Sequence, residues 1–157
     1  MTALPPFSSV LDEHRDVVWR YLVASVGRQD ASDCFQETFL AALRAYPTLR
    51  PGSNLKGWLL TVAHSKVVDA WRATQRRAVP VGAVPDDRPG PAPPPDGGDE
   101  DLWAAVRNLP PKQRTAVTAR FVADLPYADV ATIVGCSEAA ARQNVATALK
   151  TLRGELS

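Results

Sequence analysis

A proline- and glycine-rich segment in the middle of the sequence constrains the fold more than any other feature. Residues 78–99, AVPVGAVPDDRPGPAPPPDGGD, hold seven of the fourteen prolines, four glycines and almost no large apolar side chain. Such a segment buries too little apolar surface to offset the entropy lost on ordering, which favours a solvated, partly extended tether. An ordered loop packed on a domain is the alternative. The sequence therefore predicts two small domains, residues 1–77 and 100–157, joined by a flexible linker.

On both sides of this linker, apolar residues recur every three to four positions, the period of a helix with one buried face. In the first domain, helices are expected to open at Ser8 or Ser9, at Asp30 or Ser32, and at Ser53 or Asn54, and to end at Gly27, before Pro47 and near Arg77. The buried face of the second of these is expected to hold Phe35, Phe39, Ala42 and Leu43. In the second domain, the expected helices are Leu102–Asn108, Pro111–Val122, Tyr127–Val134 and Glu138–Arg153. No segment alternates with period two over five residues, so the predicted fold class is all-α.

The last two expected helices have the layout of a helix-turn-helix. A three-residue break separates them, in which Gly135 suits a positive φ and Ser137 can cap the following helix. The outward face of that helix carries Gln143, with Arg142 at its edge, and these side chain types read adenine and guanine in the major groove. Two exposed alanines on the same face indicate modest base readout. An ordinary helical hairpin is the alternative.

The third helix carries polar residues away from its apolar stripe. Trp58 lies on the same face as Ser65, Arg72 and Arg76, an arrangement that suits unstacked bases and phosphates. The preceding loop, residues 47–54, is a candidate pocket for an everted base. Alternatively, Trp58 covers the first helix and the arginines are only solvated. The second helix carries Asp33, Gln36 and Glu37 on adjoining turns. The helix dipole favours acidic residues in a first turn, and this effect is enough to explain their presence.

Charge and composition exclude several classes of protein. The net charge is only +1, divided as +3 over residues 1–77, −3 over 78–99 and +1 over 100–157. No apolar run approaches the roughly 18 residues that a membrane helix needs, and the N-terminus does not resemble a secretion signal.

Cys34 and Cys136 are expected to be reduced core thiols in a cytoplasmic protein. His14 and His64 stand alone, and no metal site, cofactor site, small-molecule substrate or catalytic group is expected.

Six short stretches together resemble the sigma-70 family of bacterial RNA polymerase specificity factors, in its extracytoplasmic-function (ECF) group. Asp33–Phe39 (DCFQETF) is similar to the family's DLVQETF, and Leu55–Ala63 (LKGWLLTVA) with Asp69 and Arg72 to its LRxWLxxIA…D…R pattern. In the second domain, Leu109–Arg114 (LPPKQR) and Leu125–Ala131 (LPYADVA) resemble LPPRQR and LSYAEIA. Val134–Glu138 (VGCSE) and Leu149–Arg153 (LKTLR) complete the pattern. The matches cover both domains in order and omit only the N-terminal tail and the linker.

The resemblance implies a role for each domain. The first domain would bind the clamp helices of core RNA polymerase through Asp33, Gln36 and Glu37, which replaces the dipole explanation. Its loop and third helix would recognise the −10 promoter element and hold a flipped base, with the following candidate residues: Arg50, Ser53, Asn54, Lys56, Trp58, Ser65, Arg72 and Arg76. The second domain would read the −35 element through Arg120, Tyr127, Ser137, Arg142, Gln143 and Lys150. An anti-sigma protein is the expected inhibitor.

The sequence also departs from the family pattern. His64-Ser65 replaces the usual Arg-Asn, Cys34-Phe35 replaces Leu-Val, and the reading helix lacks several basic side chains. The predicted function is promoter-specific initiation of transcription, without catalytic activity of its own. Two alternatives remain open: a sigma mimic that sequesters an anti-sigma factor, and a stand-alone helix-turn-helix repressor.

Overall fold

The computed structural model describes residues 4–77 and 100–156, which fold into seven α-helices and one short 3-10 helix, with no strand among them. The all-α prediction is therefore confirmed. The first domain contains α1 (Phe7–Val26), α2 (Arg28–Ala45), the 3-10 helix η1 (Tyr46–Thr48) and α3 (Leu55–Arg77). The second contains α4 (Glu100–Arg107), α5 (Pro111–Phe121), α6 (Tyr127–Val134) and α7 (Glu138–Leu156). Residues 78–99 lie outside the described residues, so the flexible linker stays a prediction.

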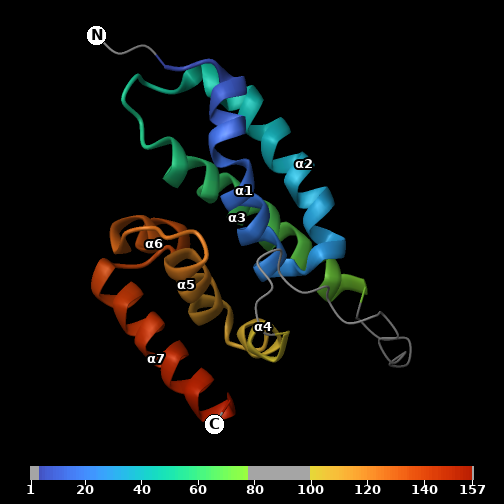
Figure 1. Cartoon of the computed structure of the whole chain (residues 1–157), viewed down its shortest axis with the longest axis vertical. Helices are drawn as coiled ribbons and strands as arrows, with labels where there is room; N and C mark the ends of the chain where they lie inside the picture. Colours follow the sequence, from blue (N-terminus) through green and yellow to red (C-terminus); the bar gives the residue numbers. More distant parts are fainter. Residues whose placement is uncertain (1–3, 78–99, 157) are drawn as a thin grey trace.

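The first domain is a bundle of three long helices, each of which contacts the other two (Figure 1). Tyr21 and Leu22 of α1 and Leu59 and Leu60 of α3 are fully buried between them. Full burial of a Leu side chain stabilises a fold by about 1.5–3 kcal/mol. The bundle is further tied by the Trp71 indole, whose Nε1 donates to the carbonyl oxygen of Ser25 at 3.3 Å.

Two helix starts were predicted wrongly because backbone geometry, and not a capping side chain, defines them. The first helix begins at Phe7 after Pro6, and neither Ser8 nor Ser9 caps it. The second begins at Arg28, directly after Gly27, whose backbone angles of φ 85° and ψ 161° are essentially restricted to glycine. By contrast, the start of α3 agrees with the prediction, because the Asn54 side chain accepts a hydrogen bond from the Gly57 amide at 3.1 Å.

Leu43 was also placed wrongly, since 52% of it is exposed. The buried residues Ala31, Thr38 and Ala42 define the centre of the α2 stripe. At 100° per residue, Leu43 points roughly 120° away from that centre, although it lies only one turn from buried Phe39.

The second domain has the predicted helix-turn-helix. Helix α6 spans the predicted Tyr127–Val134, and Gly135 follows it in the left-handed region at φ 83° and ψ 41°. Ser137 then accepts a hydrogen bond from the Ala140 amide at 3.0 Å and caps α7. Buried residues of α4, α5, α7 and the loop between α4 and α5 form a small core of their own: Ala105, Val106, Leu109, Val117, Ala148 and Leu152.

The two domains are packed directly against each other. Helix α1 contacts α4 and α5, and α3 contacts α6, so the second domain lies along one side of the first (Figure 1). A single cluster of buried side chains runs from α1–α3 into α5–α7 and includes Ala116, Leu125 and Val130 of the second domain. A surface on either domain is therefore accessible only where the other domain does not cover it.

Replacing Gly135 by alanine tests the turn. We expect Gly135→Ala to lower the free energy of unfolding by about 1 kcal/mol, because an alanine pays a backbone penalty at positive φ. A Cβ there meets no atom within 4 Å, so steric overlap adds nothing. Gly154→Ala is the matched control: a Cβ at this helical position also meets nothing within 4 Å, and the variant should be neutral or slightly more stable. Urea unfolding of both variants measures the difference, and equal effects would contradict the assignment.

Candidate nucleic-acid interface

The predicted clamp-binding residues form an exposed stripe on α2. Asp33, Gln36 and Glu37 are all exposed, on the side away from α1 and α3. Sequence reasoning missed Leu40, which is 54% exposed and lies in the middle of this stripe. The signal was available, because at 100° per residue Leu40 points opposite the buried stripe. Leu40 therefore adds an exposed apolar side chain to the acidic and amide groups of the stripe.

The loop before α3 is a compact polar turn. Gly52 adopts φ 82°, and the Ser53 hydroxyl donates to the carbonyl oxygen of Arg50 at 2.5 Å. Arg50 and Asn54 are exposed, while Ser53 and Lys56 are partly exposed. The loop therefore presents its polar side chains at the N-terminal end of α3, where the helix dipole favours anions.

After the loop, the polar residues that were predicted to form a row along α3 are exposed. Ser65, Arg72 and Arg76 all face solvent, and successive members of the row are seven or four residues apart on one face. Trp58 is partly buried, packs against the central cluster and lies 6.2 Å from the Tyr46 ring. The structure thus brings the guanidinium groups of the row together on one face and places the indole at the edge of the core.

On the helix-turn-helix, an aromatic side chain organises the predicted arginines. The guanidinium groups of Arg120 and Arg142 both lie over the Tyr127 ring, at 4.9 Å and 4.3 Å from its centroid. Each arginine also faces a carboxylate on its own side: Arg120 lies 4.0 Å from Asp124, and Arg142 lies 3.2 Å from Glu138. Cation–π contacts of this kind hold a side chain in a defined orientation as well as attracting it.

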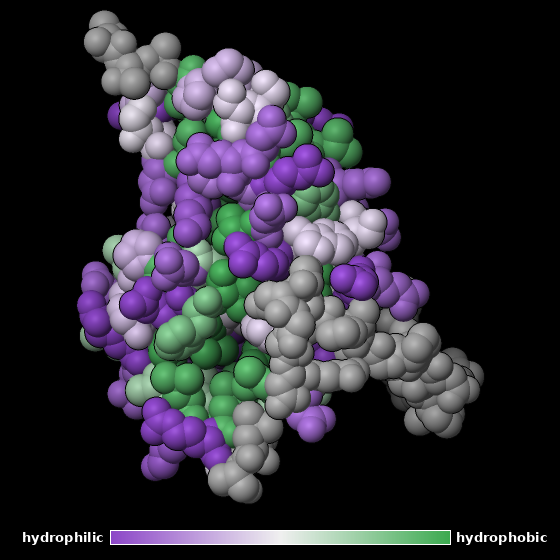
Figure 2. All heavy atoms as spheres, viewed as in Figure 1, coloured by the Kyte–Doolittle hydropathy of each residue, from purple (hydrophilic) through white to green (hydrophobic). Residues whose placement is uncertain are grey.

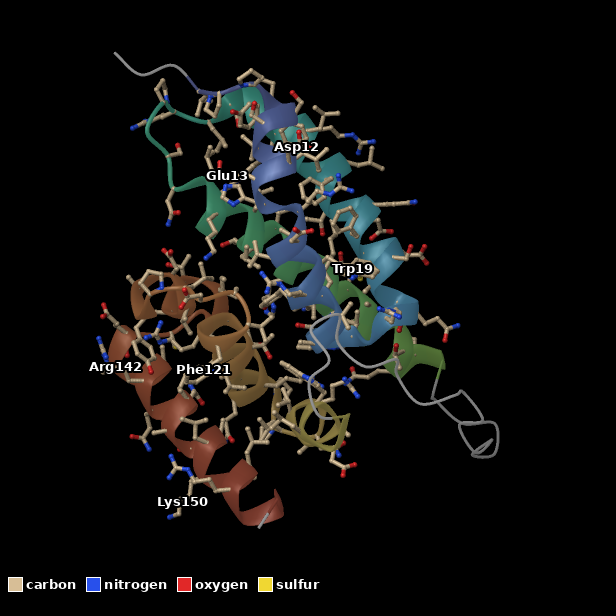
Figure 3. The ribbon with its side chains drawn as sticks, in the orientation of Figure 1. Asp12, Glu13, Trp19, Phe121, Arg142 and Lys150 are labelled. Atoms are coloured by element: carbon tan, nitrogen blue, oxygen red, sulfur yellow. The ribbon has the colours of Figure 1, made fainter. Side chains whose placement is uncertain are left out.

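The remaining candidates of the second domain lie on α7. Arg142 and Lys150 project from this helix into solvent (Figure 3). Gln143 is exposed and donates to the Thr147 hydroxyl at 3.3 Å. Ser137 is exposed, but its oxygen already accepts the capping hydrogen bond. The reading face therefore offers one guanidinium, one amide and one ammonium group for contact with DNA.

A hydrophobic surface of the second domain was not anticipated. Phe121 at the end of α5 is 59% exposed, and it borders a pocket of about 150 Å³ lined by side chains including Trp103, Val117, Val122, Leu149 and Leu152. Figure 2 shows hydrophobic side chains gathered in this region, between α4, α5 and α7. Apolar linings do not bind phosphates, so the face of the second domain that suits DNA is the α6–α7 side.

Three titratable side chains meet at the contact between the domains. The Tyr21 hydroxyl and His64 Nδ1 lie 3.0 Å apart, and the Arg114 guanidinium lies over Trp71 at 3.8 Å. Burial lowers the pKa of His64 to about 4, with a smaller contribution from the positive charge of Arg114. Burial also raises the pKa of Tyr21, so a protonated hydroxyl shares a hydrogen bond with a neutral His64, whose tautomer determines which of the two donates. His64 is therefore a structural residue here and does not extend the basic row.

The two free cysteines differ in burial. Cys34 is buried, and burial together with nearby Glu37 raises the pKa of its thiol to about 11. Cys136 is a free thiol of intermediate burial. Among residues 4–77 and 100–156, no group of three or more His, Cys, Asp or Glu side chains is placed to hold a metal ion. None of the helices in these ranges is long and apolar enough to cross a membrane.

The chain has two packed helical domains, with a basic row on the first and a helix-turn-helix on the second. This combination is typical of two-domain nucleic-acid-binding proteins. Residues 10–77 match Sigma-70 region 2, and residues 99–152 match Sigma-70 region 4. The chain is 33% identical to the probable RNA polymerase sigma-C factor of Mycobacterium bovis, over 86% of this chain and 75% of that protein. It belongs to the ECF sigma factors of the sigma-70 family, as its sequence pattern predicts.

Two further similarities extend this result. The chain is 34% identical to the ECF RNA polymerase sigma factor BldN of Streptomyces coelicolor over 93% of its own length, although it spans only 58% of that protein. Its fold resembles that of the sigma factor RpoE in a co-crystal structure with the anti-sigma factor NepR from Bartonella quintana. The TM-score is 0.84 at 24% identity, with 96% of each chain covered. The packed arrangement of both domains therefore recurs in a solved fold.

The pKa of His64 predicts a pH dependence of stability. Because the folded pKa of about 4 lies below the unfolded value of 6.5, the unfolded state binds a proton first as the pH falls. The stabilisation is complete above pH 6.5 and is lost between pH 6.5 and 4, at no more than about 1.4 kcal/mol per pH unit. In His64→Gln, urea unfolding should show a flatter profile over this window.

Tyr21→Phe is the control for this measurement. It removes the hydroxyl that lies beside His64 but leaves the imidazole in place. This variant should be less stable than the parent at every pH while keeping the steep dependence. Parallel profiles for the parent and His64→Gln would contradict the assignment.

Proposed function

We propose that this protein is a promoter-specific transcription initiation factor that binds core RNA polymerase and places its two domains on the −10 and −35 elements. The observation that carries the proposal is that regions 2 and 4 of the sigma-70 family follow each other in this chain. Each region also carries an exposed face with the required chemistry. The proposed units are residues 1–77 for polymerase and −10 binding, 78–99 as the linker, and 100–157 for −35 binding.

The first domain is proposed to bind two partners on different faces. The α2 stripe of Asp33, Gln36 and Glu37, extended by Leu40, is the contact for the polymerase clamp. The loop and row on α3 contact the −10 element, with phosphate contacts from the arginines and a flipped base near Trp58. The candidate residues of this surface are Arg50, Ser53, Asn54, Lys56, Trp58, Ser65, Arg72 and Arg76.

The second domain is proposed to read the −35 element through α7. Arg142 and Gln143 are the candidate base readers, and Arg120, Tyr127, Ser137 and Lys150 contact the backbone. Only one arginine and one glutamine are available for bidentate base contacts, each worth about 1–3 kcal/mol of discrimination. With a net charge of +1, the free chain has little of the electrostatic attraction that drives non-specific DNA binding, so its own affinity for DNA is expected to be weak. Core polymerase is therefore a necessary partner.

Regulation by an anti-sigma protein is part of the proposal. Its support is the fold shared with a sigma factor that was crystallised together with the anti-sigma factor NepR. Such an inhibitor would bind the packed domains and prevent their proposed DNA-binding surfaces from reaching promoter DNA. A factor that acts with RNA polymerase works in the cytoplasm, and it contributes binding and positioning while the polymerase performs the chemistry.

In vitro transcription tests the proposed function. Purified core RNA polymerase and this protein, incubated with a fragmented genomic library, should give discrete start sites that depend on both. We expect Trp58→Ala or Arg72→Ala to reduce transcript yield at least about tenfold, because each removes a contact to the melted −10 strand. Arg15→Ala, a change of an exposed arginine on α1, should leave the yield unchanged.

The same assay separates the alternatives. Tight binding to core polymerase or to an anti-sigma protein without any transcript would identify a sigma mimic. Sequence-specific DNA binding in the absence of core polymerase would identify a repressor. Either result would overturn the proposal.

Leu40→Ala tests the polymerase contact on α2. We expect about tenfold weaker binding to core polymerase, because a leucine buried at an interface contributes about 1.5–3 kcal/mol. The comparison variant is Arg72→Ala, which should bind core polymerase normally while failing to support transcription. Polymerase affinity can be measured by fluorescence anisotropy of the labelled protein. Unchanged affinity of Leu40→Ala would place the clamp contact elsewhere.

A further inference from the structure

Helix α6 of the second domain lies along α3 of the first. The start of α6 meets the start of α3, where Asp129 faces Asn54 and Gly57. Further along, Val134 at the end of α6 borders the same pocket as His64 and Trp71 of α3. The two helices therefore run in the same direction, and the second domain contacts the first turn of the proposed −10 helix.

The contact at this first turn is made by a carboxylate. The Asn54 side-chain amide donates to both Asp129 oxygens, at 3.1 Å and 2.9 Å. A Cβ placed on Gly57 would lie 3.1 Å from Asp129 Oδ2, so the carboxylate is close to the backbone of the turn as well. An anion at the N-terminus of a helix is favoured by the helix dipole and by the unpaired amides there.

The position of this contact matters because Asn54 begins the proposed −10 surface. At 100° per residue, Asn54, Ser65 and Arg72 lie within about 20° of one another on α3. His64 and Trp71 point some 80–100° to one side, towards the second domain. In the packed arrangement Ser65 and Arg72 remain exposed, whereas the amide of Asn54 already has an acidic partner.

We propose that Asp129 is an autoinhibitory residue, whose carboxylate takes the place of DNA at the start of α3 when the two domains are packed together. A DNA phosphate and the Asp129 carboxylate carry the same charge and seek the same donors. Packing of the domains and binding of the −10 strand therefore exclude each other. The inference rests on the proposed function, since it takes Asn54 to be a DNA contact.

Other interactions supply most of the attraction between the domains. The Arg114 guanidinium lies over Trp71, and the buried cluster continues from one domain into the other. The hydrogen bonds between Asn54 and Asp129 are exposed and contribute less. Their role is to make the packed state incompatible with DNA, so that only the open fraction of molecules binds the promoter strand.

Asp129→Ala tests the inference directly. The probe is a fluorescein-labelled, randomised 12-nucleotide single-stranded DNA, and its affinity is measured by anisotropy without polymerase. We expect Asp129→Ala to bind at least about threefold more tightly than the parent, because the open fraction rises and Asn54 is released. Small-angle X-ray scattering of the same sample should show a larger radius of gyration. Asp129→Asn, which removes the charge but keeps one acceptor, should give an intermediate affinity.

Two controls accompany these variants. Asp12→Asn removes one exposed carboxylate from α1 and should change neither affinity nor radius. Asn54→Ala breaks the same contact from the other side but also removes the proposed DNA contact, so it should enlarge the radius without tightening binding.

The outcomes distinguish this inference from the proposed function. If the parent directs transcription but Asp129→Ala binds the strand no more tightly, the inference alone is overturned. If equal increases in affinity are seen for Asp129→Ala and Asp12→Asn, general charge repulsion is the cause and the inference is also overturned. If neither the parent nor any variant directs transcription or binds the strand, the proposed function fails together with it.

Discussion

The arrangement of the two domains depends on a guanidinium group that lies on an indole. Arg114 extends from α5 over the face of Trp71 on α3, and its Nη1 also donates to the Arg107 carbonyl oxygen at 2.9 Å. The Arg114 guanidinium is partly withdrawn from water, and this burial lowers its pKa. Its Nε is buried without a hydrogen-bond partner in the described part of the chain. The aromatic face and one carbonyl therefore compensate for part of the hydration that the guanidinium loses at this junction.

This junction explains why His64 departs from the family pattern. A second arginine at this position would lie beside Arg114, and two buried like charges repel. A neutral imidazole instead contacts Tyr21 within the first domain, and its ring lies edge-on to Trp71 at 6.0 Å. The same side chain thus supports the indole on which the second domain rests. The sequence shows only that an arginine is replaced at this position, whereas the structure shows that His64 packs beside the contact between the domains.

Local sequence signals predicted the helices but not the contacts between domains. Helix α6 and the cap at Asn54 were predicted correctly because apolar period, glycine and capping residues all act within a few positions. The starts of α1 and α2 were missed because Pro6 and Gly27 define them without a side-chain cap. Leu43 was wrongly predicted to be buried because the centre of the apolar stripe on α2 was inferred from too few positions. The Asn54–Asp129 contact joins residues 75 positions apart, and no local pattern carries such information.

Several of the proposed DNA contacts already have partners within the chain. Asn54 is bound by Asp129, Arg142 by Tyr127 and Glu138, and Arg120 by Tyr127 and Asp124. Each must exchange an internal interaction for one with DNA, so the net gain per contact is smaller than that of a free side chain. The arginines also lose less entropy on binding, because they are already held in place. Such a surface favours selectivity over affinity, which is consistent with the proposed role of a factor that reaches promoter DNA together with polymerase.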